Sequence, residues 1–424
     1  MPDTTSTRRD PAGRALPGPG RLRLVTGGPG SGKSRLALEL VKQHATHEAQ
    51  RGRAAADPGG ALLVLPTYGE AQHALRSALV HWEARALWDA PFVTFTSVGE
   101  RFLPGWAVRS LPSAEERDRL MGLAMQQAGG ASLAAGHAQR GLRSRLLRLL
   151  KDIKQGVQPL EQALAGLEEG CARLALGPGE RLRDVVSVAR RYGALLAEGG
   201  LEDHEDALQR LRRALHERAP ERLPRLVAVD GFEDMTPVEV EILLRLSALV
   251  EQAGGEVLVT LPWEEEREAL FASAARLRAR LLGAGFHEQR LEGFRRAPGG
   301  ALARLARDWD RSARPAGPRT PAGAQVELLH ALDLTHEDEV VARRVRRLLD
   351  EAGTEGALVR GARDVLVVLP ALEARGAGLA QALERLGVPV HLEGARVLQA
   401  EPWVRALEPV LRVLAGEVDR KSVV

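Results

Sequence analysis

Residues 27–34, Gly-Gly-Pro-Gly-Ser-Gly-Lys-Ser, match the phosphate-binding pattern G-x-x-x-x-G-K-[ST]. Glycines lack a Cβ, so successive backbone N–H groups of such a loop can point at phosphate oxygens. The lysine of the pattern reaches the β- and γ-phosphates, and the final hydroxyl ligates Mg²⁺. The motif predicts a site for a nucleoside triphosphate with Mg²⁺, formed by Gly27, Gly28, Pro29, Gly30, Ser31, Gly32, Lys33 and Ser34.

The flanks of this loop have the periodicities that the motif needs. Residues 21–26 alternate apolar and polar side chains as a strand does, and residues 35–42 have helical spacing. The helix N-terminus adds a partial positive charge at the phosphate position. The alternative is a glycine-rich turn between a strand and a helix that binds nothing.

A second nucleotide signal is Asp230, which follows the four-residue apolar run 226–229. The carboxyl end of a buried parallel strand is where open α/β folds bind ligands, so we expect Asp230 to hold Mg²⁺ together with Ser34. The alternative is an aspartate that only begins the turn before Gly231. Glu233 is the candidate catalytic base, with Asp234 as the other possibility, provided that the turn directs the side chain back toward the phosphates. The alternative is that both carboxylates stabilise the start of the following helix.

Composition limits the possible classes of protein. Hydrophobic residues make up 44% and charged residues 27% of the 424 residues, and the formal net charge of +3 is too small to indicate nucleic-acid binding by itself. The single cysteine, Cys171, excludes a disulfide framework and any zinc or iron–sulfur site built from this chain alone. No apolar run of about 18 residues and no signal-peptide core occur, so we expect a cytoplasmic protein without a membrane partner.

Strand and helix patterns alternate in two parts of the chain, which predicts an α/β fold with parallel sheets. Between the two halves of the first part, the pattern is helical only. The expected organisation is a disordered leader (1–20), a first lobe (21–110 and 220–300), a helical insertion (111–219), a linker (301–324) and a second, incomplete lobe (325–424). In the second lobe we expect strands at 325–331, 364–370 and 388–392.

Two charged runs lie within this layout. A basic run in the helical part, of which one helix face could meet duplex phosphates, consists of Arg140, Arg143, Arg145, Arg148, Lys151 and Lys154. A solvated helix face is the alternative. The acidic run 264–268 is interpreted as the start of a helix, where negative charge is favourable.

The order of these segments resembles the N-terminal part of a UvrD/RecB-like superfamily 1 helicase. It is most similar to the AddB-type subunit of the bacterial ATP-dependent helicase–nuclease, whose form of the second nucleotide motif also has Gly where the motors have Glu. Of the motifs that carry the resemblance, only the phosphate loop is strongly specific. The other segments support the resemblance through their order and spacing along the chain. The segments that carry the resemblance are 62–72, 94–103, 229–239, 333–344, 363–369 and 387–391.

The resemblance implies two RecA-like lobes with a helical insertion in the first, the cofactors ATP and Mg²⁺, and a role in repair of DNA double-strand breaks. The implied partners are single-stranded DNA and duplex ends, and an AddA-like helicase–nuclease subunit. The single-stranded DNA contacts would be Thr67, Tyr68, Thr94, Phe95 and Thr96. The alternative for each of these side chains is an ordinary packing or turn role.

Several features of the family are missing from this chain. Gly231 has no side chain to activate water, no arginine motif follows in the second lobe, and the nuclease domain with its cluster-binding cysteines is absent. We therefore expect a fragment or truncated product. The competing hypothesis is a scaffold that binds nucleotide and DNA without translocating. A small-molecule kinase is a third hypothesis, disfavoured by the linker and the second α/β pattern.

Overall fold

The computed structural model describes residues 21–50, 60–82, 90–103, 109–173, 179–217, 223–293, 326–354, 359–370 and 372–392, with isolated positions between them. The chain divides into two compact units, Met1–Arg319 and Thr320–Val424. The predicted leader, and the predicted linker apart from Leu305, lie outside the described residues.

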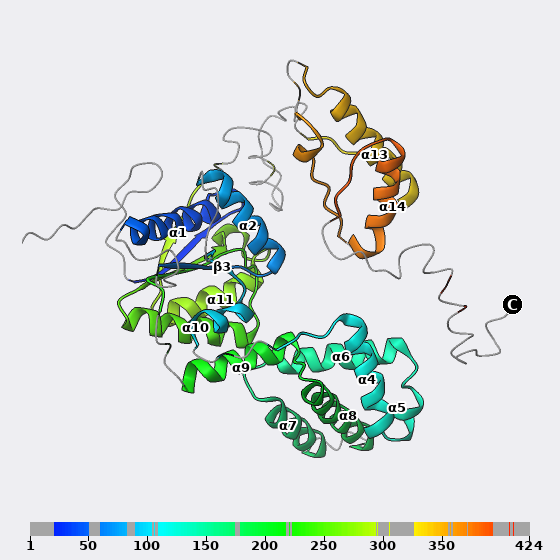
Figure 1. Cartoon of the computed structure of the whole chain (residues 1–424). Coiled ribbons are helices and arrows are strands. Elements are labelled where there is room, and N and C mark those ends of the chain that lie inside the picture. The colour runs from blue at the N-terminus through cyan, green and yellow to red at the C-terminus, as the bar shows by residue number, and fades with distance from the viewer. Residues whose placement is uncertain are drawn as a thin grey trace, which may run out of the picture. The chain divides into compact units, whose positions relative to one another are not determined.

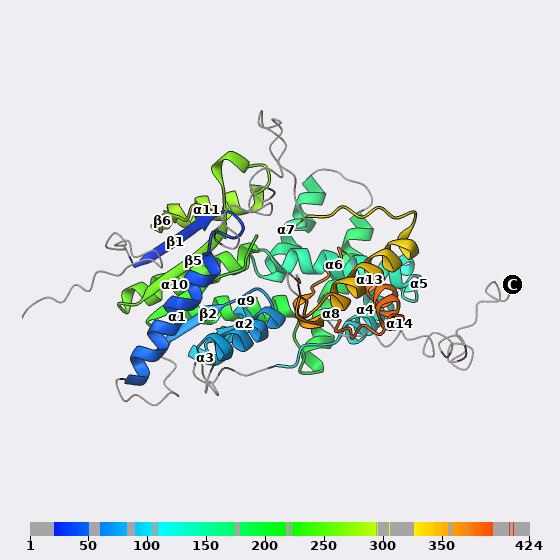
Figure 2. The same ribbon diagram turned by 90° about the horizontal axis from the view of Figure 1, so that it is seen from above.

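The first unit is built around a six-stranded sheet with the order β3-β2-β4-β5-β1-β6, in which every pair of neighbours is parallel. The α/β fold with a parallel sheet is therefore confirmed. Figure 1 shows the sheet between layers of helices, and Figure 2 shows β1 between β5 and β6. The strands are β1 (Leu22–Gly27), β2 (Ala61–Val64), β3 (Phe92–Val93), β4 (Leu226–Val229), β5 (Glu256–Pro262) and β6 (His287–Arg290).

Helices cover both faces of the sheet, as the nearly continuous apolar strands require. Successive residues of β1 show this: Leu24 lies in the core on one face and Val25 in the core on the other. Helices α1 (Lys33–Gln50) and α2 (Tyr68–His81) cover the Val25 face. The other face is covered by α3 (Phe95–Phe102), α9 (His204–Glu217), α10 (Pro237–Gln252) and α11 (Ala272–Gly283).

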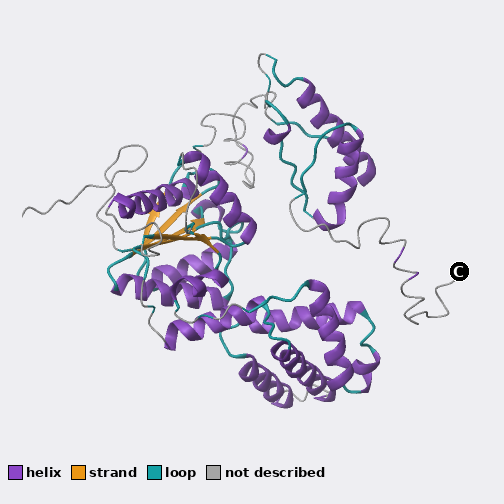
Figure 3. Ribbon diagram, in the orientation of Figure 1, coloured by secondary structure: helices purple, strands orange, loops and turns teal. Residues whose placement is uncertain are grey.

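The strand order brings three strand ends together. Strands β4, β5 and β1 are neighbours in the sheet although they are far apart in sequence. Because they are parallel, their carboxyl ends meet at one edge, which is the edge where open α/β sheets bind ligands. Figure 3 shows these strands inside the helical layers.

Between α3 and α9 the described residues are helical and have a core of their own. Buried side chains such as Met121, Met125 and Tyr192 make up that core. The predicted capping box is confirmed, because Ser113 accepts from the Glu116 N–H and the Glu116 side chain accepts from the Ser113 N–H. The helices are α4 (Ala114–Ala128), α5 (Ala131–Ala135), α6 (Arg140–Lys154), α7 (Leu160–Arg173) and α8 (Gly179–Glu198).

The end of α6 is bonded to the sheet-covering helices. The N–H of Val238, in the first turn of α10, donates to the carbonyl of Gln155 at 3.2 Å. The Gln209 side chain of α9 donates to the carbonyl of Lys154 at 2.9 Å. These bonds join the end of α6 to α9 and to α10, the helix that follows Asp230.

The second unit consists, in its described residues, of α13 (Leu334–Asp350), α14 (Leu372–Arg385) and a 3-10 turn at Ala362–Asp364. The strands predicted at 325–331, 364–370 and 388–392 are absent from the described part of this unit, so these predictions are wrong. The side chains of residues 365–368 nevertheless alternate between packed and exposed, as they would in a strand. Val365 and Val367 pack on the helices, whereas Leu366 and Val368 are 83% and 79% exposed. Side-chain alternation predicts the facing of a segment but does not provide a hydrogen-bonded neighbour.

One strand of the first unit, β6, has no apolar pattern and was not predicted from sequence. Its residues, His-Glu-Gln-Arg, lie at the sheet edge and pair with β1. Among the described helices, none has the length and apolarity needed to cross a membrane.

Candidate functional site

The phosphate loop connects the end of β1 to α1, as its sequence predicts. Gly30 and Gly32 have φ angles of 76° and 97°, in the left-handed region that favours glycine. The Leu36 N–H donates to the Gly32 carbonyl at 3.0 Å, so the helix follows directly from the loop. The backbone of the loop therefore has the form that a phosphate cradle needs.

Lys33 lies against its own loop. Its Nζ donates to the carbonyls of Gly27 and Gly28 at 2.7 and 2.8 Å, and contacts the Ser31 hydroxyl at 3.4 Å. Burial lowers the pKa of the Lys33 ammonium, and the negative charges of Asp230 and Glu264 oppose this shift. A triphosphate would supply further anionic oxygens to this half-buried cation.

Asp230 lies at the carboxyl end of β4, next to the loop. Its N–H donates to the Val64 carbonyl at 3.1 Å, which continues the β2–β4 pairing. The β4–β5 register places Thr260 beside it, and the Thr260 hydroxyl donates to the Asp230 carboxylate. The carboxylate is buried and fixed in position, as a metal ligand should be.

The residues at this site fit a magnesium ion that is bound together with a triphosphate. Mg²⁺ prefers oxygen ligands and is usually held by one or two carboxylates with substrate phosphates, not by a protein cage. Asp230 supplies a carboxylate and Ser34 an exposed hydroxyl. The described residues contain no cluster of three or more metal-ligating side chains.

A third carboxylate, Glu264, lies at the loop and was missed by the sequence prediction. It follows β5, and a Cβ placed on Gly28 would lie 1.6 Å from its Oε1. Its Oε2 accepts from Arg267 Nη1 at 3.2 Å. The sequence prediction of a helix start holds only for a 3-10 turn, Glu265–Arg267, and Glu264 precedes that turn.

Glu233, the predicted base, is exposed on the turn after Asp230. Its backbone carbonyl accepts from the Ser273 hydroxyl at 3.3 Å. The carboxylates whose charges act on Lys33 are those of Asp230 and Glu264. Within the described residues, Glu264 is therefore better placed than Glu233 to act on a phosphate held by Lys33.

Gly231 cannot be exchanged for a glutamate without strain. Its φ is 85°, and a Cβ at this position would lie 3.2 Å from Pro66 Cδ. We expect Gly231→Glu to lower the free energy of unfolding by about 1–3 kcal/mol, since a non-glycine residue is strained in this region. Urea denaturation checks this value. The matched control is Glu233→Gln on the same turn, and an unchanged midpoint for Gly231→Glu would show that the turn accommodates a side chain.

Thr67 and Tyr68, two of the predicted DNA contacts, lie at the start of α2. Thr67 is the N-cap, and its hydroxyl and N–H both bond to Glu70 in a capping box. Tyr68 is 73% exposed. The Tyr68 ring is open to a ligand, whereas Thr67 already has a structural role.

The second predicted group of DNA contacts begins α3. The Thr94 hydroxyl bonds to the hydroxyls of Thr96 and Ser97 at 2.9 and 3.0 Å. Phe95 is 3% exposed and packs against Phe232, with ring centroids 5.4 Å apart. The prediction that Phe95 contacts DNA has to be corrected, because its ring is part of the core and is not open to a base.

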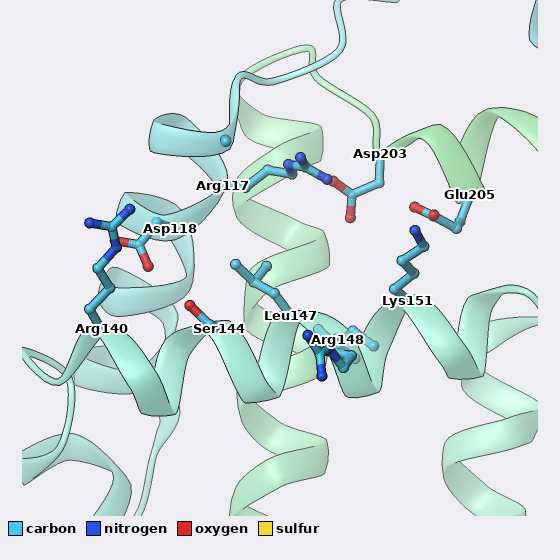
Figure 4. A pocket seen from close by; sticks show the side chains of 11 residues that line it. Arg117, Asp118, Arg140, Ser144, Leu147, Arg148, Lys151, Asp203 and Glu205 are labelled. Carbon is cyan, nitrogen blue, oxygen red and sulfur yellow. The ribbon is translucent and has the colours of Figure 1, made fainter. Parts of the chain in front are cut away.

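The basic run of α6 contributes to a cavity of about 300 Å³ between α6, the start of α4 and the start of α9. We call it the α6 groove. Figure 4 shows side chains from these three elements around it. It is lined by Ala114, Arg117, Asp118, Arg140, Ser144, Leu147, Arg148, Leu150, Lys151, Asp203 and Glu205.

Two residues of the basic run, Arg143 and Lys154, form ion pairs with acidic residues that line the α6 groove. Arg143 forms a two-point pair with Asp118 at 2.9 and 2.6 Å, and Lys154 pairs with Asp203 at 2.9 Å. These pairs neutralise two of the acidic residues of the α6 groove. The remaining charged lining residues are Arg117, Arg140, Arg148, Lys151 and Glu205, so the groove has a positive balance.

Comparison of the chain with protein-family models and with curated proteins finds no match in either set.

Proposed function

We propose that this chain is the ATP- and DNA-binding N-terminal portion of an AddB-like helicase–nuclease subunit that acts in repair of DNA double-strand breaks with an AddA-like partner. The observation that carries the proposal is the meeting of the phosphate loop with Asp230 and Glu264 at the ends of three neighbouring strands. In this proposal the first unit is a RecA-like lobe with the helices of 111–219 inserted, and the second unit begins another lobe.

The residues of the proposed nucleotide site would have different roles in binding. The backbone N–H groups of Gly27 to Ser34 would surround the phosphates, and Lys33 would neutralise their charge. Ser34 and Asp230 would hold Mg²⁺, which supplies further charge neutralisation at the phosphates when bound. Thr260 keeps the Asp230 carboxylate oriented for this role.

For DNA we propose two contact regions. Thr67, Tyr68, Thr94 and Thr96 follow β2 and β3 at the same edge of the sheet as the nucleotide site. The exposed Tyr68 ring is suited to stacking on a base. The α6 groove is suited to backbone phosphates, because its unneutralised charges are mainly cationic.

The α6 groove gives a salt-dependence prediction. Each phosphate contact adds about 0.9 to the slope of log K against log salt for duplex DNA, so removing three cations should lower that slope by about 2.7. The variant is Arg140→Ala/Arg148→Ala/Lys151→Ala, measured by fluorescence anisotropy across a salt series. The matched control removes the same charge from exposed arginines outside the groove, as Arg119→Ala/Arg145→Ala/Arg183→Ala. Equal slopes for the two triple variants would contradict a role for the groove.

The nucleotide part of the proposal is tested by binding of a fluorescent ATP analogue with and without Mg²⁺. A scaffold that binds nucleotide and DNA without turning ATP over is the second candidate, and Gly231 favours it because a base is missing from that position. ATP turnover that is stimulated by DNA, and that is well above the rate of Lys33→Ala, would exclude the scaffold.

A further inference from the structure

We propose that Glu264 accepts the proton of the water that attacks the γ-phosphate, in the role that the side-chain-free Gly231 cannot perform. This inference rests on the nucleotide site proposed above. A carboxylate is a suitable general base if it lies within hydrogen-bonding reach of that water.

The position of Glu264 follows from strand pairing. In the β1–β5 register Gly27 lies opposite Pro262, and the Trp263 N–H donates to the Gly27 carbonyl at 3.2 Å. The chain after β5 therefore runs beside the loop, and the Glu264 side chain lies over Gly28. A residue larger than glycine at position 28 would collide with the Glu264 carboxylate.

The two carboxylate oxygens of Glu264 have different surroundings. Oε2 is bonded to Arg267, whose side chain is buried and lies one helical turn further along the chain. Oε1 faces the loop at Gly28. Arg267 thus fixes the orientation of the carboxylate and leaves Oε1 beside Gly28 of the loop.

The electrostatics bring Glu264 to the same point as the phosphate-binding lysine. Its charge acts on Lys33, together with that of Asp230 from the neighbouring strand. Since the lysine of such loops reaches the β- and γ-phosphates, Glu264, which lies over Gly28 of the same loop, would lie near the end of the triphosphate where hydrolysis occurs. The Asp230 carboxylate accepts a hydrogen bond from Thr260 and is the proposed ligand of Mg²⁺, so Glu264 is the carboxylate that can act as the base.

The proposed step balances. The water oxygen forms a bond to the γ-phosphorus, and the bond between that phosphorus and the bridging oxygen of the β-phosphate breaks. The electron pair of the broken bond stays on ADP, and the proton of the water passes to Oε1 of Glu264. Lys33 neutralises the charge that develops on the phosphate oxygens.

The experiment compares Glu264→Gln with the wild type in two measurements: binding of a fluorescent ATP analogue and single-turnover hydrolysis in the presence of DNA. Glutamine keeps the shape and a carbonyl oxygen for Arg267 but is a poor base. We expect affinity within a few-fold of the wild type and hydrolysis slower by about 10²–10⁴-fold, the usual contribution of general base catalysis. The matched control is Glu265→Gln, which makes the same change at a neighbour that is 83% exposed.

Hydrolysis by Glu264→Gln at the wild-type rate would overturn the inference. Wild-type protein that binds ATP without hydrolysing it would also overturn the inference, while the proposed nucleotide site would stand. Wild-type protein that fails to bind ATP would refute the proposed function itself. Equal losses in Glu264→Gln and Glu265→Gln would show a general effect of charge and not proton transfer, and would likewise overturn the inference.

Discussion

Replacement of Lys33 by alanine is expected to abolish nucleotide binding without unfolding the protein. Removing one partner of a desolvated charge pair costs roughly 2–5 kcal/mol, which is a loss of about 30-fold or more in affinity. The hydrogen bonds of Lys33 go to atoms of its own loop, in Gly27, Gly28 and Ser31. The loss should therefore appear in ligand binding and not in the core.

The direction of the Lys33 pKa shift supports the expectation that Lys33→Ala does not unfold the protein. Burial lowers the pKa below that of an unfolded lysine, so the folded state binds this proton less tightly. Below the folded pKa the charged Lys33 thus opposes folding, and this cost is relieved as the pH rises through the folded pKa. Lys33→Ala should unfold at the same temperature as the wild type or at a higher one.

Calorimetric titration with an ATP analogue and thermal denaturation provide the two measurements for this variant. Arg35→Ala is the control, because it removes an exposed cation from the first turn of the same helix. Undiminished affinity in Lys33→Ala would refute the assignment of the loop. A large fall in melting temperature would show that the loop bonds of Lys33 stabilise the fold.

Replacement of Lys154 by methionine is expected to have the largest effect on stability. Lys154 is 3% exposed, and its Nζ lies 2.9 Å from Asp203 Oδ2 and 2.7 Å from Asp206 Oδ2. Methionine fills similar space but leaves the buried Asp203 without its cation. Breaking a buried pair in this way costs about 3–5 kcal/mol. Guanidinium denaturation should show this as a lower midpoint.

The pH dependence of the Lys154 network has a defined sign. Burial acts to lower the pKa of Lys154, but the charges of Asp206 and Asp203 outweigh it and raise the pKa above the ordinary lysine value. The stabilisation is therefore complete below the unfolded pKa and is lost only as the pH rises through the raised folded value. At neutral pH the penalty of Lys154→Met should be fully present.

Lys151→Met is the matched control for Lys154→Met, because Lys151 is exposed on the same helix one turn earlier. We expect its free energy of unfolding to stay within about 0.5 kcal/mol of the wild type. If the two methionine variants were equally stable, the buried network around Asp203 and Tyr192 would contribute nothing to folding.

The positions of the residues in the proposed nucleotide site could be predicted where their signals are local. The loop and its flanks lie within a few residues of one another, and Asp230 directly follows a recognisable strand. Glu264 could not be predicted, because its place at the loop results from the pairing of β5 with β1, which are distant in sequence. Its local context, an acidic run after a proline, equally suits the start of a helix.

The predictions of DNA contacts and of strands in the second unit were less reliable, because local sequence does not determine which way a side chain faces or whether a strand finds a neighbour. A phenylalanine between two threonines has the same sequence pattern whether its ring faces solvent or, as with Phe95, the core. The polar strand β6 has no periodicity that could reveal it. In the second unit the apolar run 365–369 has the composition of a strand, but strand formation needs a hydrogen-bonding neighbour that composition does not specify.

The hydrogen bond from Val238 to Gln155 has a mechanical consequence. Asp230 is followed by a short turn and then by α10, whose first turn holds the end of α6 through that bond. A displacement of the Asp230 turn that carries α10 along its axis must either pull α6, and with it the cationic wall of the α6 groove, or break the bond. The Val238 amide is thus one route, beside the bond from Gln209 to Lys154, by which a movement of the Asp230 turn would reach the α6 groove.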